Sequence, residues 1–86
     1  MYTIVYTKQA IKDSKKISRA GLKNNVIAIT EKLKSDPFFT PPAFEKLIGD
    51  LQGCYSRRIN IQHRIVYTIY EKEKTIKILR MWTHYE

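Results

Sequence analysis

The chain has 86 residues, which is enough for one domain but not for two, because independent domains run from about 50 to 250 residues. Its composition is 43% hydrophobic, 12% aromatic and 28% charged, too apolar and too aromatic for a disordered chain. Sixteen lysines and arginines against eight acidic residues give a net charge of +8, which favours a polyanionic partner: RNA, DNA or an acidic protein.

The few cysteines and histidines limit the compartment and the chemistry. A single cysteine, Cys54, excludes an internal disulfide and is typical of a reducing environment, so we expect a cytoplasmic protein. With only two histidines, His63 and His84, the usual Cys-rich zinc site cannot be built, and we expect no metal or other cofactor. The longest apolar run has four residues, whereas a membrane helix needs about 20, so no membrane association is expected.

The first part of the chain predicts one strand followed by two helices. Residues 2–6 alternate and are rich in aromatic and β-branched side chains, which is typical of a strand. Small and apolar side chains at helical spacing predict a helix over residues 8–20, with Thr7 as its N-cap. A second helix is predicted over residues 22–35, ending before Pro37. Its apolar face consists of Leu22, Val26, Ile29 and Leu33.

The rest of the chain predicts short strands joined by tight connections. A loop packed on the domain is expected over residues 37–44, which hold all three prolines. Strands are predicted over residues 45–48, 54–59, 64–71 and 75–81, with turns at 49–53, 60–63 and 72–74 and a tail over 82–86. Strands with such short connections pair antiparallel. We therefore expect one α+β domain over residues 1–86, with an antiparallel twisted sheet packed on the two helices.

Strand alternation divides the basic residues between two sheet faces. Arg64 shares one face with Val66, Thr68 and Tyr70, and the intervening residues share the other. The adjacent Arg57 and Arg58 point to opposite sides, so one of them should join Arg64 on the face away from the helices. Counting alone does not decide which one. His63 is expected to be an exposed histidine in a turn.

A carboxylate, arginines and a histidine are the groups that metal-free RNA cleavage needs. The candidates are Glu45, Arg58, Arg64, His84 and Tyr85. A carboxylate can take the proton of a ribose 2′-hydroxyl, an arginine can stabilise charge on phosphoryl oxygens, and a histidine can protonate the 5′-oxygen. An aromatic beside the histidine can stack on a nucleobase. Spacing alone does not single this set out, because any basic protein offers a comparable one.

The second half of the chain resembles the Txe/YoeB family of bacterial toxins in the RelE superfamily. The matching blocks are Glu45-Lys46-Leu47, the stretch LQGCYSRRI over residues 51–59, HRIVY over residues 63–67 and the terminal His84-Tyr85. Together they span roughly residues 37–85, and the SRRI and HRIVY blocks make the pattern specific. Some members carry a lysine three residues after the glutamate, where this chain has Ile48.

The resemblance implies a RelE/YoeB-like, microbial-ribonuclease-like sheet and an mRNA interferase that cuts mRNA in the ribosomal A site without a metal. It assigns Glu45 as the general base, Arg64 as the group that stabilises the transition state, His84 as the general acid and Tyr85 as a substrate-orienting aromatic. The substrate-binding candidates are Arg58, Lys46 and Arg57.

The resemblance also implies partners. These are a cognate YefM/Axe-type antitoxin, the ribosome with its mRNA, a second copy in a homodimer, and operator DNA only as the toxin–antitoxin complex. Two other readings stay open at this point: a non-catalytic, basic RNA- or ribosome-binding module, and a DNA-binding co-repressor. The first of these would block translation without cleaving RNA.

Overall fold

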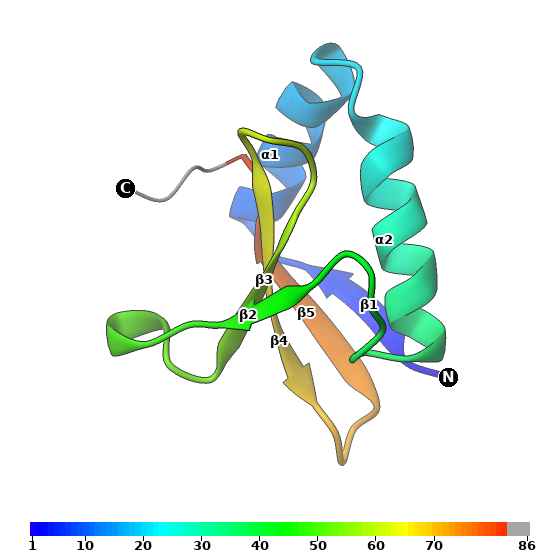
Figure 1. Ribbon diagram of the computed structural model, residues 1–86, viewed down its shortest axis with the longest axis vertical. Coiled ribbons are helices and arrows are strands. Elements are labelled where there is room, and N and C mark those ends of the chain that lie inside the picture. Colours follow the sequence, from blue (N-terminus) through cyan, green and yellow to red (C-terminus); the bar gives the residue numbers. More distant parts are fainter. Residues whose placement is uncertain (83–86) are drawn as a thin grey trace.

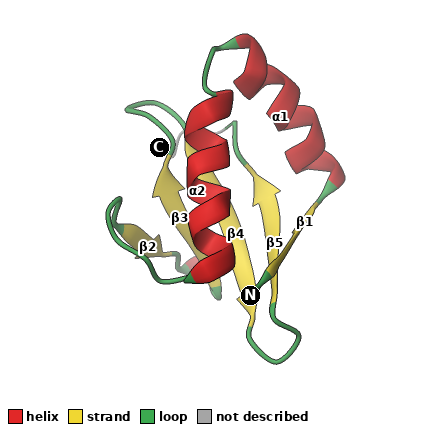
Figure 2. Cartoon of the chain, turned by 90° about the vertical axis from the view of Figure 1, so that its right-hand side faces the viewer, coloured by secondary structure: helices red, strands yellow, loops and turns green. Residues whose placement is uncertain are grey.

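The computed structural model describes residues 1–82, which form two helices and a five-stranded sheet (Figure 1). In chain order the elements are β1 (Thr3–Tyr6), α1 (Lys8–Arg19), α2 (Lys23–Ser35), β2 (Phe44–Lys46), the short 3-10 helix η1 (Gly49–Leu51), β3 (Cys54–Arg58), β4 (Arg64–Tyr70) and β5 (Thr75–Arg80). Both helices lie on the same face of the sheet (Figure 2). The predicted α+β architecture and its order of elements are confirmed.

Local sequence explains where the first helix begins. The Thr7 hydroxyl accepts a hydrogen bond from the Ala10 backbone N–H at 3.0 Å, which makes Thr7 the N-cap of α1 as predicted. The same hydroxyl donates to the Leu79 carbonyl oxygen at 2.7 Å. One side chain therefore both starts α1 and ties it to β5.

The sheet has the strand order β1-β5-β4-β3-β2. Neighbours from β2 to β5 pair antiparallel, as their short connections require. β1 instead pairs parallel with β5, so the sheet is mixed rather than antiparallel throughout. No short turn joins β1 to β5, since most of the chain lies between them, so turn lengths could not predict the relative direction of these two strands.

The core lies between the helices and one face of the sheet. The helices contribute Ala10, Ile17, Val26, Ile29 and Leu33, and the sheet contributes Ile65, Tyr67, Ile76 and Ile78. The opposite sheet face has no helix over it, so it is left for contact with other molecules. Among residues 1–82, neither helix is long and apolar enough to cross a membrane.

Candidate active site

The uncovered face of the sheet gathers the polar groups of three neighbouring strands. Strand pairing sets Glu45 of β2 opposite Ser56 of β3, and Arg58 of β3 opposite Arg64 of β4. Paired residues in a sheet point to the same side. The register therefore answers the question that counting left open: Arg58, not Arg57, shares a face with Arg64.

Glu45 and Arg64 form an ion pair on this face, which links the edge strand β2 to the start of β4. The Arg64 Nη2 donates to Glu45 Oε1, and the Arg64 Nε donates to Ser56 Oγ at 3.0 Å. The Arg64 side chain is 13% exposed, whereas that of Glu45 is 64% exposed. The guanidinium is thus held from two sides, while the carboxylate remains open to an incoming ligand.

A groove of about 420 Å³ contains this ion pair. It is lined by Glu45, Leu47, Ile48, Leu51, Ser56, Arg58, Ile61, Gln62 and Arg64. Arg58 is exposed, and its Nη1 donates to the Ile61 carbonyl oxygen at 3.3 Å. Two guanidinium groups and one accessible carboxylate therefore share one open groove, which suits a phosphate that carries a neighbouring hydroxyl.

The described chain ends next to this groove. Trp82 stacks on His63, with ring centroids 3.8 Å apart. His63 directly precedes Arg64 and is buried, so the expectation of an exposed turn histidine is wrong. Its burial follows from the Trp82 stack and from a turn in which Asn60 Oδ1 accepts from the Gln62 and His63 N–H groups. His84 and Tyr85, the predicted acid and its aromatic neighbour, lie outside the described residues.

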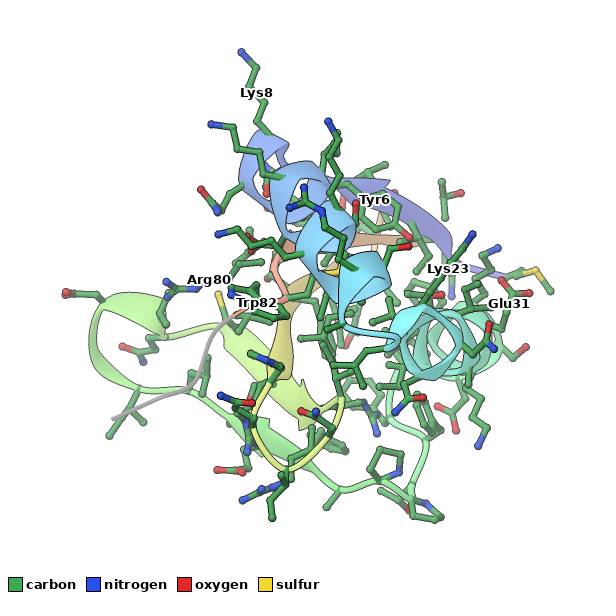
Figure 3. All side chains as sticks on the ribbon, turned by 90° about the horizontal axis from the view of Figure 1, so that it is seen from above. Tyr6, Lys8, Lys23, Glu31, Arg80 and Trp82 are labelled. Atoms are coloured by element: carbon green, nitrogen blue, oxygen red, sulfur yellow. The ribbon has the colours of Figure 1, made fainter. Side chains whose placement is uncertain are left out.

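Asp13 of α1 anchors the same part of the chain. It is 2% exposed, and its Oδ2 accepts hydrogen bonds from the backbone N–H groups of Met81 at 3.1 Å and Trp82 at 3.3 Å. Its Oδ1 accepts from Gln9 Nε2 at 2.8 Å. Figure 3 shows Arg80 and Trp82 together at this end of the molecule, while Lys8 projects away from it. A buried carboxylate therefore fixes the chain just before His84.

The structure corrects the assignment of Arg57 to substrate binding. Its side chain is 0% exposed and points into the helix-side layer. It donates from Nε to the Tyr67 hydroxyl at 2.8 Å, from Nη1 to the Pro42 carbonyl at 2.6 Å and from Nη2 to the Pro37 carbonyl at 3.1 Å. The guanidinium also lies 3.7 Å from the centre of the Phe39 ring. Arg57 thus holds the loop that leads into β2.

Lys46 does not join the site either. It pairs with Tyr55, one position away from the Glu45–Ser56 pair, so its side chain leaves β2 on the opposite side from Glu45. No three His, Cys, Asp or Glu side chains come together as a metal site within residues 1–82.

Two polar residues of this region were not singled out by the sequence. Ser56 lies within the SRRI block, yet its hydrogen bond to Arg64 depends on the β3–β4 register. Asp13 left a clearer signal, because it stands between Ala10 and Ile17 on the buried face of α1. A carboxylate in that position needs hydrogen-bond donors from elsewhere in the fold.

Two helices on one face of a five-stranded mixed sheet define a fold shared with small bacterial toxins. YafQ of Escherichia coli, at 17% identity, superimposes with a TM-score of 0.83 over 98% of this chain and 94% of its own, a likeness of fold alone. Sequence gives the family: the family model for the YoeB-like toxin of bacterial type II toxin-antitoxin systems matches residues 6–85. The chain belongs to the YoeB toxin family.

Individual relatives agree with this membership. Toxin YoeB of Synechocystis is 38% identical over 74 residues, which is 86% of this chain and 77% of the relative. The YoeB/ParE toxin of Agrobacterium tumefaciens is 27% identical with a TM-score of 0.87, covering 96% of this chain and 99% of its own. YoeB in a heterotetrameric complex with YefM from Staphylococcus aureus is 30% identical with a TM-score of 0.82, covering 99% of both chains.

Proposed function

We propose that this toxin is an mRNA interferase, a metal-independent endoribonuclease whose catalytic centre is the groove around Glu45 and Arg64. The observation that carries the proposal is the ion pair itself. A solvent-open carboxylate is held beside a guanidinium that Ser56 fixes from the other side. Among the described residues, these two contacts use only part of the hydrogen-bonding capacity of Arg64, which leaves N–H groups for a phosphate.

The reaction follows from the chemistry of these groups. Glu45 takes the proton of a ribose 2′-hydroxyl, and the 2′-oxygen attacks the adjacent phosphorus. Arg64 stabilises the charge that builds on the phosphoryl oxygens, and Arg58 binds the same phosphate from across the strand pair. The bond from phosphorus to the 5′-oxygen breaks, and His84 gives that oxygen its proton. The products are a 2′,3′-cyclic phosphate and a free 5′-hydroxyl, so the cleavage step consumes no water.

The roles of His84 and Tyr85 are proposed from the sequence pattern, with support from the chain that precedes them. Trp82 is held by the Asp13 carboxylate and by the ring of His63, which is the neighbour of Arg64. Only Thr83 separates Trp82 from His84. Tyr85 follows directly and would orient the substrate by stacking on a base.

We also propose that cleavage takes place on mRNA in the ribosomal A site, where the ribosome holds the RNA strand in place. A small open groove supplies few contacts for positioning RNA on its own, and positioning accounts for much of the rate in such reactions. The result is inhibition of translation in the cytoplasm. The +8 charge favours both the rRNA surface and the mRNA.

The proposed regulator is a YefM/Axe-type antitoxin. The Staphylococcus aureus relative forms a heterotetrameric complex with YefM, and its YoeB is also known as a dimer. We extend both assemblies to this chain, with operator DNA bound only by the toxin–antitoxin complex. An acidic antitoxin segment would complement the net charge of +8, which results from 16 basic and 8 acidic residues.

The test is primer-extension mapping of an mRNA translated in vitro, with and without ribosomes. Wild-type protein should cut at discrete sites only with ribosomes, and the fragments should carry 5′-hydroxyl ends that a polynucleotide kinase can label. Glu45→Gln and His84→Gln should each lower the cleavage rate by about 10²–10⁴, the usual contribution of a general base or a general acid. Glu31→Gln is the matched control, because Glu31 is a similarly exposed carboxylate, 61% exposed, in an ion pair with Lys34.

Two results would contradict the proposal. Undiminished cleavage by Glu45→Gln and His84→Gln would remove both residues from the mechanism. Arrest of translation with intact mRNA would instead support the non-catalytic, basic RNA- or ribosome-binding module, in which Arg58 and Arg64 bind phosphates without chemistry.

A further inference from the structure

Two isoleucines at the rim of the groove are exposed to an unusual degree. Ile48 is 87% exposed and Ile61 is 91% exposed, whereas the other exposed isoleucines, Ile11 and Ile27, are 51% and 45% exposed. Both rim residues line the groove that contains Glu45 and Arg64. A concave surface in which apolar side chains surround a few polar groups is typical of a ligand site.

Both side chains stand on loops whose backbone is hydrogen-bonded. Ile61 belongs to a turn closed by the Ile59 N–H, which donates to the His63 carbonyl at 2.8 Å, and by Arg58, which donates to the Ile61 carbonyl itself. Ile48 follows Leu47, whose N–H donates to the Cys54 carbonyl at 2.9 Å, and directly precedes η1. The exposure of Ile48 and Ile61 is therefore set by two connections whose backbone is held by hydrogen bonds.

The two isoleucines flank the polar centre. Ile48 lies in the connection before β3 and Ile61 in the connection after it, at opposite ends of that strand (Figure 1). The five residues of β3 span roughly 13 Å. Ser56 lies at the middle of the strand, where it binds Arg64. An extended dinucleotide has this layout, with a base at each end and a phosphate between them.

We propose that Ile48 and Ile61 form two apolar subsites that receive the bases on either side of the phosphate bound by Arg58 and Arg64. This assignment rests on the proposed RNA-cleaving function and adds how the groove holds its substrate. Contact with an isoleucine side chain does not select one base, because every base offers a flat apolar face. Glu45 favours a ribonucleotide over an acidic peptide as the occupant, because its exposed carboxylate can accept a hydrogen bond from the ribose hydroxyl beside the phosphate, a donor that an ionised acidic side chain lacks.

The test uses an RNA dinucleotide with 2′-deoxyribose at the attacking position, which cannot be cleaved. In a titration at low salt, the methyl NMR signals of Ile48 and Ile61 should move upfield, because they enter the ring-current field of the bases. Those of Ile11 and Ile27 should not move. An analogue with abasic sugars should leave all four signals in place. Ile48→Gln and Ile61→Gln should each weaken binding about three- to tenfold, whereas Ile11→Gln and Ile27→Gln should not.

Several outcomes would overturn the assignment. These are the absence of saturable binding, static Ile48 and Ile61 methyl signals, or equal shifts with the abasic analogue. Glutamine variants that bind the dinucleotide like wild type but no longer bind a YefM-type antitoxin would assign the rim to a protein partner instead. Because the probe cannot be cut, its result is independent of catalysis. Base-dependent methyl shifts in a protein that never cleaves mRNA would leave these subsites standing and refute only the proposed reaction.

Discussion

Replacing Arg57 by methionine tests the buried arginine most directly. Methionine keeps much of the apolar stem but loses the donors to Pro37, Pro42 and Tyr67. Hydrogen bonds from a charged group are worth about 1.5–3 kcal/mol each. The variant also avoids desolvating a cation, which returns several kcal/mol. We expect a net loss of about 2–4 kcal/mol in the free energy of unfolding, and a Tm about 10–25 °C lower.

Arg58→Met is the matched control, since the two residues are neighbours on β3 with opposite orientations. Arg58 is exposed, so its loss should change the free energy of unfolding by less than about 0.5 kcal/mol. It should instead weaken the binding of the uncleavable RNA dinucleotide. Urea unfolding followed by circular dichroism measures the first effect. Equal stability of the two variants would refute the structural role of Arg57. A loss of stability in Arg58→Met alone would show that Arg58, not Arg57, is the arginine that stabilises the fold.

Three other polar side chains give measurable effects. Glu45→Gln should change the free energy of unfolding by less than about 1 kcal/mol, because the Glu45 carboxylate is 64% exposed and solvent screens its ion pair with Arg64, and a larger loss would contradict the open carboxylate. Asp13→Asn should cost about 1–2 kcal/mol and speed hydrogen exchange at the Met81 and Trp82 amides, since a neutral acceptor is weaker; unchanged exchange would show that Asp13 does not hold them. Burial raises the pKa of Tyr67 above its ordinary value of 10.0, against the opposing effect of Arg57. The unfolded chain therefore ionises first, so this contribution to stability is complete below about pH 10 and is lost as the pH rises toward the raised value. Tyr67→Phe should show a shallower alkaline decline in stability than wild type, and parallel declines would refute this.

Much of the fold could be predicted because its signals are local. The apolar spacing of Val26, Ile29 and Leu33 gave the buried face of α2, and Thr7 marked the start of α1. Gly53, at the end of the predicted turn before β3, has a φ of 91°, a conformation that other residues rarely adopt. Strand alternation also placed Arg64 on the correct face of β4 before any pairing was known.

The remaining features depend on contacts between distant segments. Whether Arg57 or Arg58 faces the groove is set by the β3–β4 register, which one extra residue in the connection would reverse. Lys46 is a substrate-binding candidate in the sequence, but strand alternation turns its side chain to the side opposite Glu45. The two backbone donors to Asp13 Oδ2 come from the far end of the chain, 68 and 69 residues away, so the sequence showed only that this carboxylate needs partners.

The alternation of β3 links the stability of this small domain to the geometry of its groove. Arg57 is a poor device for stability alone, because desolvation of a buried cation offsets much of its hydrogen bonding. What its planar guanidinium supplies is direction: its N–H donors, held at fixed angles, set the positions of the Pro37 and Pro42 carbonyls that accept from them. Two residues after Pro42 the chain enters β2, where Phe44 pairs with Arg57 and Glu45 follows. A buried cation on one face of the sheet thereby helps to fix where the candidate base Glu45 stands on the other face, in its ion pair with Arg64.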